Sequence, residues 1–568
     1  MDDYLTSLDE SLRDTLPPAS PLRGLLRRGK ADLNELLWTI KPDWPQLGEP
    51  SIQQLHRIMK VSAKPEPNPT GRRILIFSMR AWRIHNVWEG LIGRGLLERG
   101  ANPRVVICDG LPRCDMFSLN MSGNSSQLCQ SCLNYTRQLF HFFGLSVQQL
   151  SNFLDESDRN EAKEMVRSWT DDYELFVAEG LPIGEFVRPS LMRTLLRGSL
   201  ERDPHTLQLY QEYLEAGVLI ARMFQRMLDV LEPETLLMLN GMFFAERIGT
   251  AIAKKHQLHL VTHERGFMMN RLVMAHNRPA SWLQIDEAWS HFKDKPLTPA
   301  EELELDKYLE QRETGKAEVT NYWPSAEVRQ DFIVNQLNLD YRRPILTVFP
   351  NILWDTAVYQ TDLGFESMFK WLEYTIHEMN HLPQLQLIIR VHPAEVRLPN
   401  QESRERVIDR LAQTYPSLPE NVVIISPESN ISSYALIDLS TAIGVYTSTI
   451  GLEGALRGVP VFVTGKTHYR NKGFTYDIDD PKQYSKFLRE ISILKSISSE
   501  RIALARRYAH LFFLRSMLPI SLVTEKNEHS IQFNFETFDA LKPGQDRMLD
   551  HICRAILERK DFVSDWRY

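Results

Sequence analysis

The chain has 568 residues, of which 43% are hydrophobic and 24% are charged, and its formal net charge is -7 at pH 7. A single hydrophobic core seldom grows beyond about 250 to 300 residues, so this length predicts two large domains with extensions. The acidic balance argues against non-specific nucleic-acid binding, because such binding needs a basic surface that neutralises phosphates.

The first residues and the cysteine count bear on location. The sequence begins with MDDYLTSLDESLRD, which is acidic and forms neither the basic nor the apolar region of a secretory signal. The sequence has no run of about 18 apolar residues that could cross a membrane. Its five cysteines suit a reducing compartment. These features predict a cytoplasmic protein, and peripheral association with a membrane through partners stays open.

The N-terminal half predicts a helical extension followed by an α/β domain. Residues 1–69 are predicted to form this extension, because helical apolar spacing runs to about residue 65 and the breaker-rich KPEPNPTG that follows marks a boundary. The strand RRILIFSM, a helix near 85–100 and the strand PRVVICDG then form a βαβ unit, which requires a parallel sheet. After a helical stretch, TLLMLNG and LHLVTHERG resume the sheet pattern. Residues 70–325 are therefore predicted to form a Rossmann-like domain with a helical insertion.

A capping signal near the end of this half predicts one further helix. Thr298 and Glu301 have the spacing of a capping box, with Pro299 at the first helical position. We expect the helix to run from there to a C-cap at Gly315 and to close the N-terminal half.

Residues 340–545 predict a second domain of the same class. PILTVFPNILWD, LQLIIRVHP, NVVIIS and STAIGVYTSTIGLEGALRGVPVFVTG contain buried strands that alternate with helices. This alternation is typical of a doubly wound parallel sheet. Residues 546–568 are expected to contain a helix that crosses back to the first domain. The predicted fold class is therefore α/β, with two Rossmann-like doubly wound domains and a helical N-terminal extension.

In an open parallel sheet, ligands bind beyond the carboxyl ends of the strands. Polar or small residues follow several strands of the second domain and are the candidates for binding a nucleotide sugar. They are Asn351, Asp355, Arg390, His392, Pro393, Thr447, Ser448, Thr449, Gly451, Glu453, His468 and Tyr469.

The Ser-Thr turn before the small-residue helix is the first of these candidates. Thr447, Ser448 and Thr449 precede Gly451, so a helix start with free N–H groups and little bulk is suited to phosphate. Glu453 could accept hydrogen bonds from a ribose. The alternatives are a plain N-cap with small residues for packing, and a solvated helical glutamate.

Basic residues supply the other candidates in this domain. His392 lies between Arg390 and Pro393 at a strand end, where a protonated or donor imidazole could bind phosphate and stabilise the leaving group. His468 and Tyr469 could add contacts to the sugar or phosphate. The alternatives are a structural histidine and a basic surface loop.

In the first domain, Glu264 lies at the end of the strand segment LHLVTHERG and could take a proton from an acceptor hydroxyl as a general base. The alternative is a surface ion pair between Glu264 and Arg265. Arg80, Arg83 and His85 follow the first strand and are further candidates.

The cysteines and a short acidic motif raise the question of a metal. Cys108, Cys114, Cys129 and Cys132 approach the spacing of a four-thiolate zinc site, and the alternative is a set of unrelated buried thiols. Asp477-Ile478-Asp479 has the Asp-x-Asp spacing of a metal-binding motif, but a two-residue match in a loop carries little weight.

The IRVHPAE turn, the YTSTIGLEGALRGVPVFVTGKTHYRNKGFT block and the FPNILWD segment resemble the bacterial capsule polysaccharide biosynthesis family of GT-B glycosyltransferases. This family includes the Kdo transferases of capsule assembly and is similar in logic to bacterial sialyltransferases. The resemblance spans about residues 70–545 and is strongest over 340–480. It implies two Rossmann-like domains that face a cleft, with the donor on the second domain and the acceptor on the first.

The resemblance also implies roles for individual residues. His392 matches the histidine that contacts the donor phosphate, and Ser448 and Thr449 match the Ser/Thr motif at the nucleotide. Glu264 lies where an acidic catalytic residue is expected. Its HERG context departs both from the acidic-acidic-Gly pattern of sialyltransferases and from the Gln-Glu pair of the Kdo enzymes. The catalytic base and the stereochemical outcome therefore stay open.

Together these implications predict a glycosyltransferase that moves a sugar from a nucleotide-sugar donor to a glycan or lipid-linked acceptor in surface or capsule polysaccharide synthesis. GT-B enzymes generally need no bound metal, so no cofactor is expected apart from the zinc alternative at the cysteines. Two rival hypotheses are a GT-B nucleotide-sugar epimerase and a non-catalytic subunit that binds a glycan or nucleotide.

Overall fold

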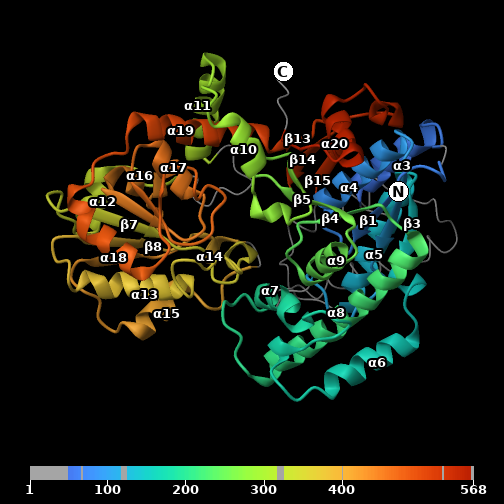
Figure 1. Ribbon diagram of the computed structural model, residues 1–568, viewed down its shortest axis with the longest axis horizontal. Coiled ribbons are helices and arrows are strands. Elements are labelled where there is room, and N and C mark those ends of the chain that lie inside the picture. Colours follow the sequence, from blue (N-terminus) through green and yellow to red (C-terminus); the bar gives the residue numbers. More distant parts are fainter. Residues whose placement is uncertain are drawn as a thin grey trace, which may run out of the picture. The chain divides into compact units, whose positions relative to one another are not determined.

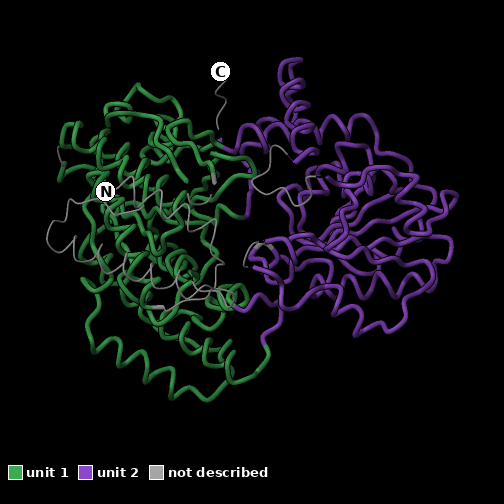
Figure 2. The backbone as a smooth tube through the Cα atoms, turned by 180° about the vertical axis from the view of Figure 1, so that it is seen from behind, with its two compact units in different colours: residues 1–194, 201–281, 518–562 green, residues 195–200, 282–517, 563–568 purple. Residues whose placement is uncertain are grey.

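The computed structural model describes residues 49–65, 68–116, 125–315, 325–398, 401–527 and 530–563. The chain forms two compact units (Figure 2). Unit 1 contains the chain up to Thr194, Glu201–Ser281 and Leu518–Phe562, and unit 2 contains Leu195–Leu200 and Trp282–Met517. Most of the predicted N-terminal extension, residues 1–48, lies outside the described residues.

Unit 1 is built on a seven-stranded sheet of order β13-β6-β5-β4-β1-β2-β3 (Figure 1). Strands β1 to β5 pair in parallel, and β6 and β13 are antiparallel additions at one edge. The order β3-β2-β1-β4-β5 is that of a Rossmann sheet, which reverses direction between β1 and β4. The strands are β1 Arg73–Ser78, β2 Asn102–Ile107, β3 Ser146–Gln149, β4 Thr235–Leu239, β5 His259–Arg265, β6 Arg271–His276 and β13 Leu518–Pro519.

Helices cover both faces of this sheet. Helix α4 packs on β1 and β2, and α5 packs on β2 and β3. Helix α9 packs on β4 and β5, and α8 packs against α9 and places Phe224 against Phe77 of β1. The helices are α3 Pro50–Val61, α4 Arg83–Leu97, α5 Ser125–Phe142, η1 Leu150–Asn152, α6 Glu156–Arg167, η2 Tyr173–Leu175, α7 Ile183–Leu195, α8 Pro204–Leu231, α9 Phe244–Lys255 and η3 Ala280–Trp282.

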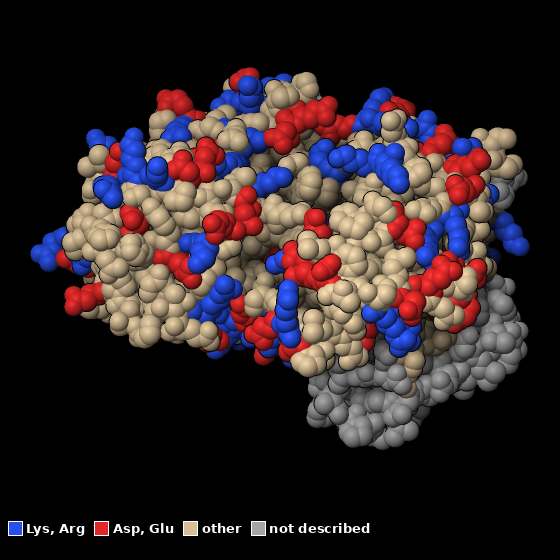
Figure 3. Space-filling view, turned by 60° about the horizontal axis from the view of Figure 1, so that its bottom comes forward, with Lys and Arg blue, Asp and Glu red and all other residues tan. Residues whose placement is uncertain are grey.

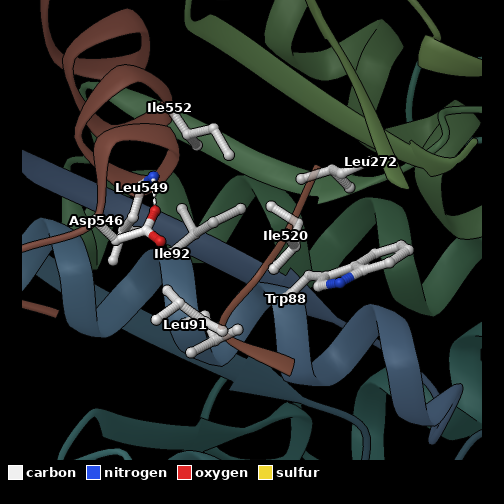
Figure 4. A pocket seen from close by; sticks show the side chains of 9 residues that line it. Trp88, Leu91, Ile92, Leu272, Ile520, Asp546, Leu549 and Ile552 are labelled. Carbon is white, nitrogen blue, oxygen red and sulfur yellow. Dashed lines mark hydrogen bonds between the residues drawn. The ribbon is translucent and has the colours of Figure 1, made fainter. Parts of the chain in front are cut away.

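The chain returns to unit 1 at Leu518, ahead of the return predicted near residue 546. This returning segment forms β13, the hairpin β14 Val523–Asn527 and β15 Ser530–Phe533, η7 Phe538–Leu541 and α20 Arg547–Glu558. Helix α20 packs on α4, where Trp88, Leu91 and Leu549 line an apolar cavity of only about 10 Å³ (Figure 4). The returning segment therefore packs as part of unit 1.

Unit 2 contains a six-stranded, all-parallel sheet of order β12-β11-β10-β7-β8-β9. This is the complete Rossmann order, and its direction reverses between β7 and β10. Helices α13 and α15 lie on one side of the sheet, and α16 and α17 lie on the other (Figure 1). The strands are β7 Ile345–Phe349, β8 Gln386–Arg390, β9 Val422–Ile425, β10 Ala442–Val445, β11 Val461–Val463 and β12 Tyr476–Asp477.

The helices of unit 2 follow the predicted alternation. They are α10 Asp286–Phe292, α11 Pro299–Glu313, α12 Gln330–Gln336, η4 Thr356–Val358, α13 Met368–Met379, α14 Ala394–Arg397, α15 Val407–Thr414, α16 Ser433–Leu439, α17 Ile450–Leu456, α18 Pro481–Glu490, η5 Ile491–Ile493, α19 Ser499–Ala509 and the π-helical η6 His510–Arg515. The prediction of two doubly wound parallel α/β domains is thereby confirmed.

Helix α11 begins as the capping box predicts. The Thr298 hydroxyl accepts from the Glu301 N–H, and the Glu301 carboxylate accepts from the Thr298 N–H. The helix ends at Glu313, and Gly315 follows the C-cap with a φ of +70°. However, α11 belongs to unit 2, so the units divide after Ser281 rather than between residues 325 and 340.

Two surface properties complete the description. Among the described residues, no helix combines the length and the apolar character needed to span a bilayer. On the face shown in Figure 3, basic and acidic side chains of the described residues are interspersed.

Candidate functional site

The carboxyl ends of β7 and β10 meet at the point where the unit 2 sheet reverses direction. Phe349 pairs with Val445, so the residues that follow these strands, Asn351 and Thr447, come from neighbouring strand ends. The Asn351 Oδ1 and Thr447 Oγ1 atoms are buried and have no hydrogen-bond partner among the described residues. An unpartnered buried polar atom costs about 1 to 3 kcal/mol. Two such atoms at a Rossmann switch point indicate a place where ligand atoms complete the hydrogen bonding.

The Ser-Thr turn beside this point is supported from behind by Tyr469. The buried Tyr469 hydroxyl donates to the carbonyl of Ser448. A Cβ atom added at Gly451 would lie 2.3 Å from the Tyr469 Oη, so position 451, in the first turn of α17, has room for glycine alone. Tyr469, which the sequence suggested as a sugar contact, therefore acts as a support for the turn.

Glu453 lies in the first turn of α17 but does not stand free. Its Oε1 atom lies 2.9 Å from the Nε atom of Arg312 on α11, and both side chains are buried. Arg312 also reaches the Thr449 Oγ1 atom at 3.5 Å. Sequence reasoning missed Arg312, because no local spacing links α11 to a helix more than a hundred residues away.

His392 lies just beyond the carboxyl end of β8, as predicted. Its Nδ1 atom accepts a hydrogen bond of 3.1 Å from the Ala394 N–H, which places the proton of the neutral ring on Nε2. Burial, with a smaller contribution from Arg390, lowers the pKa of His392 to about 4. Its imidazole is therefore a neutral hydrogen-bond donor at pH 7 and not a cation. Pro393 forms the turn that leads into α14.

Three other residues that were predicted to bind the nucleotide sugar make contacts within unit 2. Arg390 is buried and donates to the carbonyls of Ser426, Ser429 and Ile431, so it braces the loop after β9. His468 stacks on Phe512 and lies 2.9 Å from the Tyr508 hydroxyl, and its burial lowers its pKa to about 3. Asp355 lies in the loop after β7, and its N–H donates to the Ile352 carbonyl.

In unit 1, Glu264 lies at the end of β5 next to the end of β4. Its Oε2 atom accepts from Asn240 Nδ2 at 2.8 Å, and its Oε1 atom accepts from the Arg265 N–H at 2.7 Å. The His85 Nε2 atom lies 3.9 Å from Oε1. Burial raises the pKa of Glu264, although these hydrogen bonds oppose the shift. A carboxylate with a raised pKa that is still partly exposed is suited to accept a proton.

The alternative hypothesis for Glu264 was an ion pair with Arg265. The Arg265 guanidinium instead pairs with Glu525 of β14 at 2.6 Å. Asn240 was missed in the sequence, although the strand TLLMLNG ends in the Asn-Gly pair that produces this turn.

Other charged side chains of unit 1 form buried or partly buried pairs. The His263 Nε2 atom lies 3.0 Å from Glu89, which also accepts from the Ser78 hydroxyl. Arg80 pairs with Glu246 and Asp115; burial lowers the pKa of Arg80, but these two carboxylates raise it above its usual value overall. The other first-strand candidate, Arg83, pairs with Glu49.

The four cysteines line one small cavity of about 20 Å³ beside the ends of β1 and β2. Cys132 accepts a hydrogen bond from the Ala81 N–H, and burial raises the pKa of all four thiols. Among the described residues, no group of three or more His, Cys, Asp or Glu side chains is arranged to hold a metal ion. The zinc site therefore stays a prediction.

Residues 306–487 match the profile of the family described as "Capsule polysaccharide biosynthesis protein". This stretch begins within α11, contains all six strands of unit 2 and includes every residue predicted to bind the nucleotide sugar. No curated protein matches the chain.

Solved structures share low sequence identity with the chain. The KpsC beta Kdo 2,4 transferase of Thermosulfurimonas dismutans is 13% identical over 48% of this chain and 79% of its own, with a TM-score of 0.31. A putative UDP-N-acetylglucosamine 2-epimerase of Listeria monocytogenes is 12% identical over 87% of this chain and 100% of its own, with a TM-score of 0.28. The resemblance drawn from the His-Pro turn and the Ser-Thr block is confirmed at residues 306–487, which match the capsule polysaccharide biosynthesis family.

Proposed function

We propose that this protein is a glycosyltransferase of the GT-B type that moves a sugar from a nucleotide-sugar donor to a glycan or lipid-linked acceptor in surface or capsule polysaccharide synthesis. The observation that carries the proposal is the pair of buried oxygens of Asn351 and Thr447, which have no hydrogen-bond partner in the described part of the chain. They lie at the Rossmann switch point of the unit whose sequence matches the capsule family. The proposal includes a cytoplasmic location, peripheral membrane association through partners and a reaction that needs no bound metal.

The donor nucleotide sugar would bind at the carboxyl edge of unit 2. The Nε2–H of His392 is a neutral donor suited to a phosphate oxygen, and the Ser448–Thr449 turn adds backbone and hydroxyl groups. Asn351 and Thr447 would bond to the sugar or the nucleotide. Arg390 and Tyr469 act from behind the site, because the two terminal nitrogens of Arg390 and the hydroxyl of Tyr469 already bond to backbone carbonyls.

In the proposed reaction, the acceptor hydroxyl oxygen bonds to the anomeric carbon of the donor sugar. The bond from that carbon to the phosphate oxygen breaks, and its electron pair leaves with the nucleotide. Glu264 takes the proton of the acceptor hydroxyl, which its raised pKa favours. The His392 Nε2–H stabilises the charge that develops on the departing phosphate.

The thermal shift of the purified protein with CMP, UDP, GDP and dTDP tests the donor site. A ligand at a hundredfold excess over its Kd stabilises a protein by about 2.7 kcal/mol, so a true donor class should be visible. We expect one nucleotide to shift the wild type but not His392→Ala. His377→Ala, an exposed histidine on α13, is the matched control and should behave as the wild type.

Two outcomes would contradict the proposal. If none of the four nucleotides raises the Tm, the proposed donor site is wrong and a non-catalytic subunit is favoured. Conversion of the corresponding nucleotide sugar without any acceptor would instead indicate an epimerase.

A further inference from the structure

The turn after β4 fixes the orientation of one buried amide. Gly241 adopts a φ of +84°, and a Cβ atom at this position would lie 3.2 Å from Pro279. This left-handed residue lets the chain reverse, so that the Met242 N–H donates to Asn240 Oδ1 at 2.9 Å. Because the oxygen of the amide accepts this bond, the Asn240 nitrogen must point the other way.

The nitrogen points at Glu264. Strands β4 and β5 are parallel neighbours in which Leu239 pairs with His263, so the next residues of both strands lie side by side. Asn240 Nδ2 donates to one oxygen of Glu264, and the Arg265 N–H donates to the other. Both donors are held by the backbone, directly or through the Asn-Gly turn. The Glu264 carboxylate therefore has one orientation.

We propose that Asn240 is a positioning residue, which orients Glu264 and stabilises its carboxylate form so that it can take a proton. This inference rests on the proposed function, in which Glu264 is the general base. Other charged or titratable groups near Glu264 are His85 on α4, His263 and Arg265 on β5, and Glu525 on β14, which pairs with Arg265. Among the hydrogen bonds that the described residues make to Glu264, the bond from Asn240 is the one that a side-chain substitution can remove.

The test replaces the Asn240 amide, which donates a hydrogen bond to Glu264, with a carboxylate of the same shape, which cannot donate one when ionised. In Asn240→Asp, a second carboxylate replaces the amide beside Glu264, and two adjacent carboxylates retain a proton to a higher pH than either alone. A group whose pKa is raised by folding stabilises the protein below its unfolded pKa, and this stability is lost as the pH rises. The variant should therefore lose stability more steeply between pH 5 and pH 8 than the wild type.

The measurement is the Tm of the purified full-length protein across this pH range. We expect the fall in Tm from pH 5 to pH 8 to be at least about 3 °C larger for Asn240→Asp than for the wild type. In the double variant that adds Glu264→Gln, the amide introduced on β5 can donate to the carboxylate introduced on the β4 turn, and the additional fall should vanish. Asn160→Asp, on the exposed side of α6, adds the same charge and should change nothing.

An identical pH dependence in Asn240→Asp and the wild type would overturn the inference. So would an additional fall that persists in the double variant, because it would then not involve Glu264. If Asn240→Asp fails to fold, Asn240→Ser removes the amide donor without adding a charge and should cause a smaller fall of the same sign. A normal pH profile for that variant would equally overturn the inference.

The experiment uses no substrate, so it succeeds or fails independently of the proposed function. Nucleotide binding to unit 2, tested with His392→Ala, addresses the proposed function separately. If nucleotides bind and the pH dependence follows the prediction, the pH profile of transfer in Asn240→Asp should shift upward on its acidic side by about one unit.

Discussion

The buried guanidinium of Arg312, in the last turn of α11, lies 2.9 Å from the buried carboxylate of Glu453, in the first turn of α17. This pair joins the helix at the start of the family match to the helix behind the proposed donor site. Removing one partner of a buried pair leaves an uncompensated charge, which costs about 3 to 5 kcal/mol.

We therefore predict that Arg312→Met lowers the free energy of unfolding by about 3 kcal/mol or more, measured by urea denaturation. The double variant with Glu453→Gln should recover most of this loss, because no buried charge then remains. Arg342→Met, which breaks an exposed pair with Asp340, should cost less than about 1 kcal/mol. Equal losses in Arg312→Met and Arg342→Met would contradict the prediction.

Thr447→Val tests the unpartnered hydroxyl at the switch point. Because this hydroxyl has no partner among the described residues, replacing it with a methyl group should leave the stability of the free protein unchanged or raise it. Nucleotide affinity, measured by calorimetry, should fall about 5- to 30-fold, since one ligand hydrogen bond is lost.

The matched control for this variant is Thr375→Val. The Thr375 hydroxyl is buried and bonds to the Trp371 carbonyl and the Tyr484 hydroxyl. Its loss should destabilise the protein without changing nucleotide affinity. A destabilised Thr447→Val that binds nucleotide normally would refute the assignment of Thr447 to the donor site.

Glu395, in α14 just after His392, should give the protein a pH dependence. Its side chain is fully buried, and this burial raises its pKa to about 7, although the Val407 N–H donates to it and opposes the shift. The folded state therefore favours the protonated acid. Stability from this group is full below pH 4.5 and is lost as the pH rises through about 7.

Glu395→Gln removes this titration. The free energy of unfolding of the variant and of the wild type is measured by urea denaturation at pH 4.5 and at pH 8. We expect the difference, variant minus wild type, to be about 2 to 3 kcal/mol larger at pH 8 than at pH 4.5. Glu366→Gln, at an exposed position, should show no such gain. A constant difference between Glu395→Gln and the wild type at both pH values would show that Glu395 titrates normally.

The zinc prediction can be tested directly by elemental analysis. It requires about one zinc per chain in the wild type and a loss of zinc in Cys132→Ser. Cys553→Ser alters a buried cysteine on α20 and should keep the metal. If the protein purified without chelators lacks zinc, Cys108, Cys114, Cys129 and Cys132 are free thiols and the prediction is wrong.

The sequence by itself determined the local elements. The strands RRILIFSM and LQLIIRVHP contain the continuous apolar runs ILIF and LII, because both faces of a parallel strand are buried. The capping box at Thr298 and the Asn-Gly pair at 240–241 likewise encode their turns in adjacent residues. These signals act within a few residues of one another, so they can be read without knowledge of the rest of the chain.

The tertiary structure decided the strand order and the partners of the polar side chains. Nothing in the separate segments FPNILWD and YTSTIG places β7 next to β10, yet that pairing brings Asn351 and Thr447 to neighbouring strand ends. Arg390 and His468 look like ligand contacts in the sequence, but packing turns them toward backbone carbonyls and aromatic rings. Periodicity records which side of an element is buried, whereas the partner of a buried polar group is set by packing between distant segments.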